Sequence, residues 1–179
     1  MNRRLFWALS AVGLLFMSVG NFADAEDLKT GDPIPDFEMV GSDGKTYSKK
    51  SLKGKAFVIS WYPKAFTGGW TAECKSLRES GKAIRAYDVA YFTASCDKAE
   101  VNKKFAESLE LDYPILSDPS KEVAKKFGCL SRRGFSSRWT YYVDAEGKIL
   151  EIDKKVKART HGADIAEKLE ELKIKKVKK

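Results

Sequence analysis

The chain has 179 residues, of which 43% are hydrophobic, and a formal net charge of +8 at pH 7. Its three cysteines are too few for a disulfide-rich scaffold, and their odd number leaves at least one thiol without an intrachain partner. The single histidine, His161, argues against a histidine-rich metal site and against a cysteine–histidine or serine–histidine catalytic pair that does not include it.

The first 25 residues have the pattern of a secretory signal peptide. Arg3 and Arg4 precede an apolar run over residues 5–19, and Ala23 and Ala25 place small side chains at the two positions that a signal peptidase reads. The run is short for a membrane-spanning helix, so we expect cleavage rather than a stable membrane anchor. The prediction is an exported protein, periplasmic or extracellular, whose residues 26–179 form one domain.

The predicted elements of this domain alternate between strands and helices. Strands are expected where apolar residues alternate or run continuously between turn signals, and helices where apolar residues recur every three or four positions. The expected strands are 37–40, 45–47, 56–61, 89–94, 113–117, 139–143 and 148–152. The first two and the last two of these strands are expected to form hairpins around the glycine-containing turns 41–44 and 144–147. The expected helices are 71–87, 99–109, 118–127 and 163–172. This order predicts an α/β fold with a central mixed sheet flanked by helices.

Positive charge is concentrated at the C-terminal end of the chain. Five lysines crowd there, namely Lys173, Lys175, Lys176, Lys178 and Lys179. Attraction to nucleic acid or to a membrane surface is one interpretation of such a cluster. Because no aromatic residue or arginine is interleaved with these lysines, we expect a solvated lysine-rich tail and no nucleic-acid partner.

One loop has the setting of an activated cysteine. Ligands of α/β sheets gather beyond the carboxyl ends of the strands, and residues 61–74 leave the predicted strand 56–61 at such an end and lead into a helix. The positive end of a helix dipole and its free N–H groups stabilise a thiolate, which is the reactive form of cysteine. The residue at the mouth of this helix is Trp70, whose indole is not a nucleophile.

The run Tyr62-Pro63-Lys-Ala-Phe-Thr67-Gly-Gly-Trp70-Thr71-Ala-Glu73 resembles the active-site motif of the peroxiredoxins. These form the alkyl hydroperoxide reductase/thiol-specific antioxidant family, and the chain is most similar to its bacterioferritin-comigratory branch. Further matches follow in order at 95–97, 111–118, 125–128 and 138–149, so the resemblance extends over about 28–173.

This resemblance implies a thioredoxin-like fold and an antioxidant oxidoreductase. The implied reaction is the thiol-dependent reduction of hydrogen peroxide or small organic hydroperoxides. The implied partners are the peroxide and a thioredoxin-like or small-thiol reductant, and the family uses no metal and no bound organic cofactor. A monomer or a homodimer is the expected assembly.

The resemblance also assigns roles to individual residues. Pro63 would shape and shield the pocket, and Thr67 would donate a hydroxyl hydrogen bond to the peroxide and the thiolate. Arg138 would hold both by charge-assisted hydrogen bonds, and Glu73 would orient that arginine. Position 70 would be the peroxidatic cysteine, which becomes a sulfenic acid, and here it is Trp70.

Three interpretations of Trp70 stay open. The chain is a peroxiredoxin relative that has lost its nucleophile and serves as a non-catalytic thioredoxin-fold binding or scaffold protein. Alternatively, codon 70 encodes cysteine, because the cysteine codons and UGG differ only in the third base. In the remaining interpretation codon 70 is a UGA that encodes selenocysteine and is written as tryptophan. The nucleotide sequence of codon 70 distinguishes the three.

The cysteines and the histidine have less specific interpretations. Cys74 lies near the family's resolving position and is either a structural or leftover resolving thiol or a substitute nucleophile. Cys96 follows a buried strand and is expected near the same end of the sheet, where a disulfide with Cys74 is an alternative. Cys129 is expected in the core, and His161 on the surface or as a helix cap.

Overall fold

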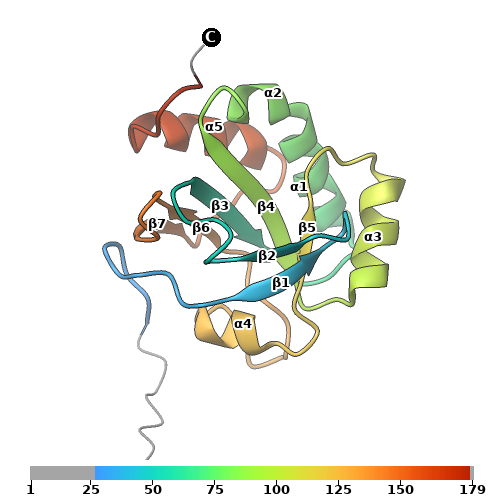
Figure 1. Ribbon diagram of the computed structural model, residues 1–179. Helices are drawn as coiled ribbons and strands as arrows, with labels where there is room; N and C mark the ends of the chain where they lie inside the picture. Colours follow the sequence, from blue (N-terminus) through green and yellow to red (C-terminus); the bar gives the residue numbers. More distant parts are fainter. Residues whose placement is uncertain (1–26, 178–179) are drawn as a thin grey trace, which may run out of the picture.

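The computed structural model describes residues 27–177, so the predicted signal peptide lies outside the described residues and stays a prediction. A central sheet lies between helices, as Figure 1 shows. Within residues 27–177, no helix is both long enough and apolar enough to cross a membrane.

The central sheet contains seven strands in the order β2-β1-β5-β4-β3-β6-β7 among the described residues. Their bounds are β1 Glu38–Gly41, β2 Thr46–Ser48, β3 Ala56–Trp61, β4 Val89–Ser95, β5 Ile115–Ser117, β6 Thr140–Val143 and β7 Ile149–Asp153. The three central strands β5, β4 and β3 are parallel, whereas β1 and β6 join them in antiparallel pairs. The predicted mixed sheet and its two hairpins are therefore confirmed.

Helices cover both faces of the sheet. Their bounds are α1 Gly68–Glu79, α2 Gly81–Ile84, α3 Ala99–Ser108, α4 Glu122–Lys126 and α5 His161–Glu171. Buried residues of α4 pack in the core cluster that contains Phe57 and Ile59, whereas Leu77 of α1 and the buried apolar residues of α5 pack in the cluster that contains Val58. Figure 1 accordingly shows α4 away from α1 and α5. Every residue of β3 is buried, as its continuous apolar run predicts.

Two helices differ from their predicted bounds because of local backbone geometry. The predicted helix 71–87 begins earlier, at Gly68, and is divided after Glu79 into α1 and the short α2. Gly81 begins α2, and glycine is a poor residue in a helix interior. The helix predicted over 118–127 begins only at Glu122, because Lys121 has a φ of 65° in the left-handed region.

The lysine-rich tail is only partly as predicted. The side chains of Lys173, Lys175 and Lys176 are exposed, but the backbone of this segment is hydrogen-bonded to the segment that precedes β4. The Asp88 amide donates to the Lys175 carbonyl at 2.7 Å, and the Val177 amide donates to the Ala86 carbonyl at 2.9 Å. Lys178 and Lys179 lie outside the described residues.

Candidate active site

The loop between β3 and α1 is held by the segment that follows β4. The Ala65 amide donates to Asp97 Oδ2 at 2.8 Å, and the Tyr62 hydroxyl donates to Asn102 Oδ1 at 2.7 Å. On the other side, the Ser136 hydroxyl donates to the Tyr62 carbonyl. The sequence prediction that residues 95–97 lie next to this loop is therefore confirmed, and the loop has a fixed path into α1.

Thr67 caps the start of α1 with its backbone rather than its side chain. Its carbonyl accepts hydrogen bonds from the amides of Trp70 at 3.1 Å and Thr71 at 2.9 Å. Its exposed hydroxyl donates to the Lys64 carbonyl at 3.1 Å. The half-buried Pro63 lies in the same loop. The structure thus brings Thr67 and Pro63 to the helix mouth, with the threonine hydroxyl bonded within the loop.

Trp70 is the third residue of α1 and is completely buried. Its indole stacks on the Tyr62 ring with centroids 3.3 Å apart and planes 7° apart, and the Phe105 ring lies 6.3 Å away. Cys74, Ala65 and Phe105 belong to the same buried cluster. The indole therefore fills the space at the helix mouth and exposes no reactive group to solvent.

Arg138 lies beside the first turn of α1 and is held there by Glu73. The guanidinium donates from Nη1 to Glu73 Oε2, and its other nitrogen, Nη2, lies 3.6 Å from where a Cβ on Gly69 would be. Glu73 is 0% exposed and the Arg138 side chain 27%. A fully buried carboxylate needs a positive partner and hydrogen-bond donors, and Arg138 supplies both. The pairing predicted for these two residues is confirmed.

His161 is the site residue that the sequence prediction missed. It begins α5 but is buried, with Nδ1 2.8 Å from Glu73 Oε1 and Nε2 2.9 Å from Thr140 Oγ1. The predicted surface or capping role is therefore wrong. The helix crossing explains the burial: a Cβ on Gly162 would lie 2.2 Å from the Ser76 carbonyl oxygen, so α5 approaches α1 closely only with glycine there. The only sign of this burial in the sequence was the glycine that follows His161 at the start of an amphipathic helix, because such a glycine allows close contact with another helix.

The charged groups that face His161 have opposing effects on its pKa. Burial is the largest effect and lowers the pKa from 6.5 to about 4. Asp153 and Asp164 raise this pKa, and the positive charge of Arg138 lowers it. The imidazole is therefore neutral at pH 7, and it lies against Glu73 as a hydrogen-bonding group rather than as a second cation.

Stability is expected to fall as the pH is lowered from about 6.5 to about 4. In this window the unfolded chain binds a proton at His161 more readily than the folded chain, because the folded pKa is about 4. The contribution of neutral His161 is complete above pH 6.5 and is lost below pH 4, and at most it amounts to about 3 kcal/mol. Urea unfolding at several pH values in this range measures how the free energy of unfolding changes with pH.

A His161→Asn variant is the control for this pH dependence. Asparagine does not titrate, so the free energy of unfolding of the variant should vary less between pH 6.5 and pH 4 than that of the unaltered chain. Equal slopes for the two proteins would contradict the assignment of the pH dependence to His161.

The cysteines are not arranged as a redox pair. All three are free thiols in the structure. Cys74 packs in the cluster around Trp70, on the α1 face of the sheet, whereas Cys96 and Cys129 pack in the cluster on the α4 face. Cys96 lies near the predicted end of the sheet, but it packs in a different cluster from Cys74, so the alternative of a disulfide between them is wrong. Burial raises the pKa of the Cys74 thiol well above its usual value, and Cys129 is a core residue as predicted.

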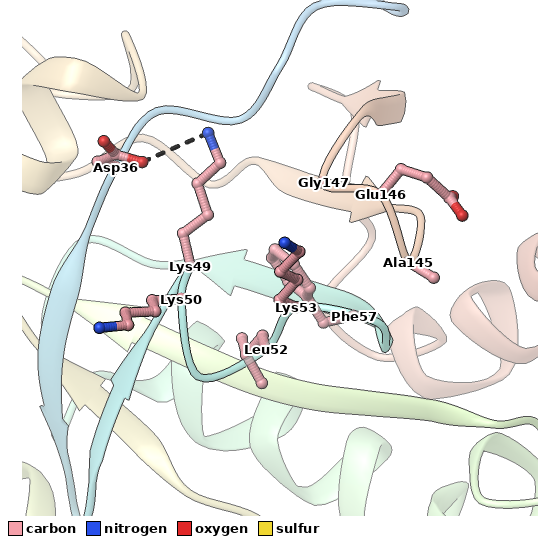
Figure 2. Close-up of a pocket in the computed structure, with 9 residues that line it drawn as sticks. All are labelled: Asp36, Lys49, Lys50, Leu52, Lys53, Phe57, Ala145, Glu146 and Gly147. Carbon is pink, nitrogen blue, oxygen red and sulfur yellow. Dashed lines mark ion pairs between the residues drawn. The ribbon is translucent and has the colours of Figure 1, made fainter.

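A cavity of about 280 Å³ lies at the opposite, amino-terminal end of β3 (Figure 2). Leu52 and Phe57 supply its apolar part, and Lys49 spans one side to form an ion pair with Asp36 at 3.4 Å. None of the predicted site residues lines it. Among residues 27–177, no three histidine, cysteine or acidic side chains are grouped so that they could hold a metal ion.

Comparison with known proteins places the chain in a family. The AhpC/TSA family model matches residues 30–152. Peroxiredoxin Bcp of Escherichia coli (strain K12) is 30% identical over 141 residues, which cover 75% of this chain and 90% of the relative. Peroxiredoxin Bcp of Bacillus subtilis (strain 168) is 28% identical over 152 residues, which cover 81% and 97%.

Solved structures agree with this assignment. Peroxidoxin BcpB from Mycobacterium tuberculosis superposes with a TM-score of 0.71 at 31% identity, covering 82% of this chain and 97% of that one. A cysteine-to-serine mutant of Xylella fastidiosa PrxQ has a TM-score of 0.75 at 17% identity, covering 82% and 98%, and supports the fold. The chain therefore belongs to the AhpC/TSA family, as a relative of the Bcp peroxiredoxins, which are thiol peroxidases with a thioredoxin-like fold.

Proposed function

We propose that the residues around position 70 form a peroxide-reducing site and that its chemistry needs a thiol or a selenol at that position. The observation that supports this is the guanidinium of Arg138, fixed by the buried Glu73 beside the first turn of α1. A cation at a helix N-terminus stabilises an anion there. Burying a charge pair is costly, and an inert scaffold gains nothing from that cost.

The proposed reaction follows from that electrostatic environment. A thiolate at position 70 attacks one oxygen of the peroxide, the O–O bond breaks, and the products are a sulfenic acid and the alkoxide or hydroxide of the leaving group. Arg138 stabilises the thiolate and then the negative charge on the departing oxygen. A small thiol or a thioredoxin-like protein then reduces the sulfenic acid through a disulfide and releases water.

With tryptophan at position 70 the chain is expected not to reduce peroxide, and a Trp70→Cys variant is expected to do so. The indole supplies no nucleophile, and Cys74 is buried with a raised pKa. Loss of a nucleophile removes several orders of magnitude of rate, so the gain should be about a thousandfold or more. Consumption of hydrogen peroxide and of cumene hydroperoxide, with dithiothreitol or thioredoxin as reductant, measures it.

A Trp70→Ser variant is the matched control for this experiment. Serine opens the same space as cysteine but provides no thiol, so its peroxide consumption should equal that of the tryptophan protein. Equal activity of the tryptophan protein and Trp70→Cys would contradict the requirement for a nucleophile at position 70. The absence of activity in both would overturn the peroxidase proposal.

A non-catalytic binding or scaffold role is the second candidate, and the complete burial of Trp70 favours it. Its ring stacks on Tyr62 inside an apolar cluster, as a structural aromatic residue does. The nucleotide sequence of codon 70 in the gene distinguishes the two candidate functions. A UGG in genomic DNA favours this second candidate, whereas a cysteine codon, or UGA followed by a selenocysteine stem-loop, favours the peroxidase.

A further inference from the structure

Polar side chains from four elements of the fold form a row of consecutive contacts that ends at Arg138. Ser60 of β3 and Thr140 of β6 place their hydroxyl oxygens 3.3 Å apart, and the Thr140 oxygen lies 2.9 Å from Nε2 of His161 on α5. The other ring nitrogen, Nδ1, lies 2.8 Å from Oε1 of Glu73 on α1. Arg138 donates to the second oxygen of that carboxylate. Every member except Arg138 is buried.

For a neutral ring beside an ionised Glu73, the hydrogen positions along these contacts have one consistent arrangement. Glu73 Oε1 and His161 Nδ1 face each other at 2.8 Å, and neither atom makes a well-aligned hydrogen bond, with the other or with any group in the part of the chain that the structure describes. Because a carboxylate only accepts, the hydrogen belongs on Nδ1. Nε2 of the neutral ring then accepts from the Thr140 hydroxyl, which in turn accepts from Ser60.

We propose that His161 is a positioning residue of the site at position 70, acting through Glu73 on Arg138. This inference rests on the peroxide-reducing function proposed above. The terminal torsion of a glutamate has a broad energy minimum, so one hydrogen bond does not fix the plane of the carboxylate. The approach of Nδ1 to Oε1 at 2.8 Å supplies the second contact, and with both oxygens contacted the guanidinium is held in one orientation beside the first turn of α1.

Neutrality of the imidazole is part of this role. Glu73 faces His161 from α1, Thr140 from β6, Asp153 from β7 and Asp164 from α5 itself. A protonated ring would compete with Arg138 for the single buried carboxylate. A neutral ring donates one hydrogen bond and leaves Arg138 as the cation that pairs with Glu73. Nη2 of Arg138 then stays directed toward the mouth of α1.

The first test uses the unaltered chain and needs no activity. His161 is the only histidine in the sequence, so its ring nitrogens give unambiguous signals in a long-range ¹H–¹⁵N NMR spectrum. We expect the neutral tautomer with hydrogen on Nδ1 at pH 7. Observation of the Nε2–H tautomer, or of a charged imidazolium at that pH, would overturn the proposal.

The second test measures what His161 does for the site. In a Trp70→Cys background, His161→Asn retains an N–H close to the Nδ1 position, whereas His161→Leu removes it at similar volume. The pH dependence of iodoacetamide alkylation at position 70, followed by mass spectrometry of the peptide that contains it, gives the pKa of the introduced thiol separately from the three native cysteines. We expect the leucine change to raise that pKa by about one unit, a tenfold change in thiolate fraction below the pKa, and the asparagine change to raise it much less.

The outcomes separate this proposal from the proposed function. If Trp70→Cys does not reduce peroxide but its thiol pKa still rises with His161→Leu, the peroxidase proposal fails and the positioning role stands. If Trp70→Cys is active and neither the thiol pKa nor the rate changes in the leucine variant, the positioning role fails. If His161→Leu does not fold, the tautomer seen by NMR and the thiol pKa in the His161→Asn variant test the positioning role.

Discussion

Replacing Glu73 by alanine is expected to lower the free energy of unfolding by about 3–5 kcal/mol, because it breaks a buried charge pair from one side. Glu73 is completely buried between Arg138 and His161. Without it, the partly buried guanidinium loses its counter-charge, and the imidazole loses the carboxylate oxygen that lies 2.8 Å from Nδ1. Denaturation by urea, followed by circular dichroism, measures the loss.

Glu79→Ala is the matched control, since Glu79 ends the same helix and is exposed. Its replacement should change the free energy of unfolding by no more than about 0.5 kcal/mol. Similar losses for the two variants would show that Glu73 contributes helix propensity or surface charge rather than a buried pair, and would contradict the network around it.

Truncating Trp70 to alanine is expected to cost about 3–5 kcal/mol, because it leaves a cavity where the indole stacks on Tyr62. Thermal and urea unfolding measure the change. Trp139→Ala is the control, because Trp139 is only half-buried and lies under the ammonium group of Lys154 at 4.0 Å. A loss at position 70 no larger than that at position 139 would contradict the burial described here.

This stability effect bears on the restoration of activity. Trp70→Cys opens part of the same cavity, so the variant expected to gain peroxide reduction is also expected to be less stable than the tryptophan protein. The indole therefore stabilises the fold at the position where the proposed reaction needs a nucleophile. Activity of the variants is best compared at a temperature well below their unfolding transitions.

Most of the fold could be predicted from the sequence, because it depends on local patterns. The apolar run of β3 has the predicted bounds, and both hairpins form around the turns that glycine signals predicted. Helix bounds were less predictable. The division between α1 and α2 lies at Ser80, which caps both helices, and the late start of α4 depends on the left-handed backbone of Lys121; periodicity specifies neither.

Only those residues of the candidate site that lie in recognisable motifs could be predicted. Pro63, Thr67, Trp70 and Glu73 belong to one short segment, and Arg138 came from the resemblance of a second segment. His161 lies on a distant helix, and its position depends on the close approach of α5 to α1. Alternation along β4 could have excluded a disulfide between Cys74 and Cys96, because residues 92 and 94 pack on the α4 face and residue 96 continues that parity.

The contact between α1 and α5 also has a consequence for how the site is completed. Gly162 of α5 donates to the Ser76 hydroxyl of α1 across 86 residues of sequence. His161 faces Glu73 only when α5 is docked on α1, whereas the pair of Arg138 and Glu73 needs no residue of α5. A peroxide-reducing thiol at position 70 would therefore have its full electrostatic environment only with α5 in place.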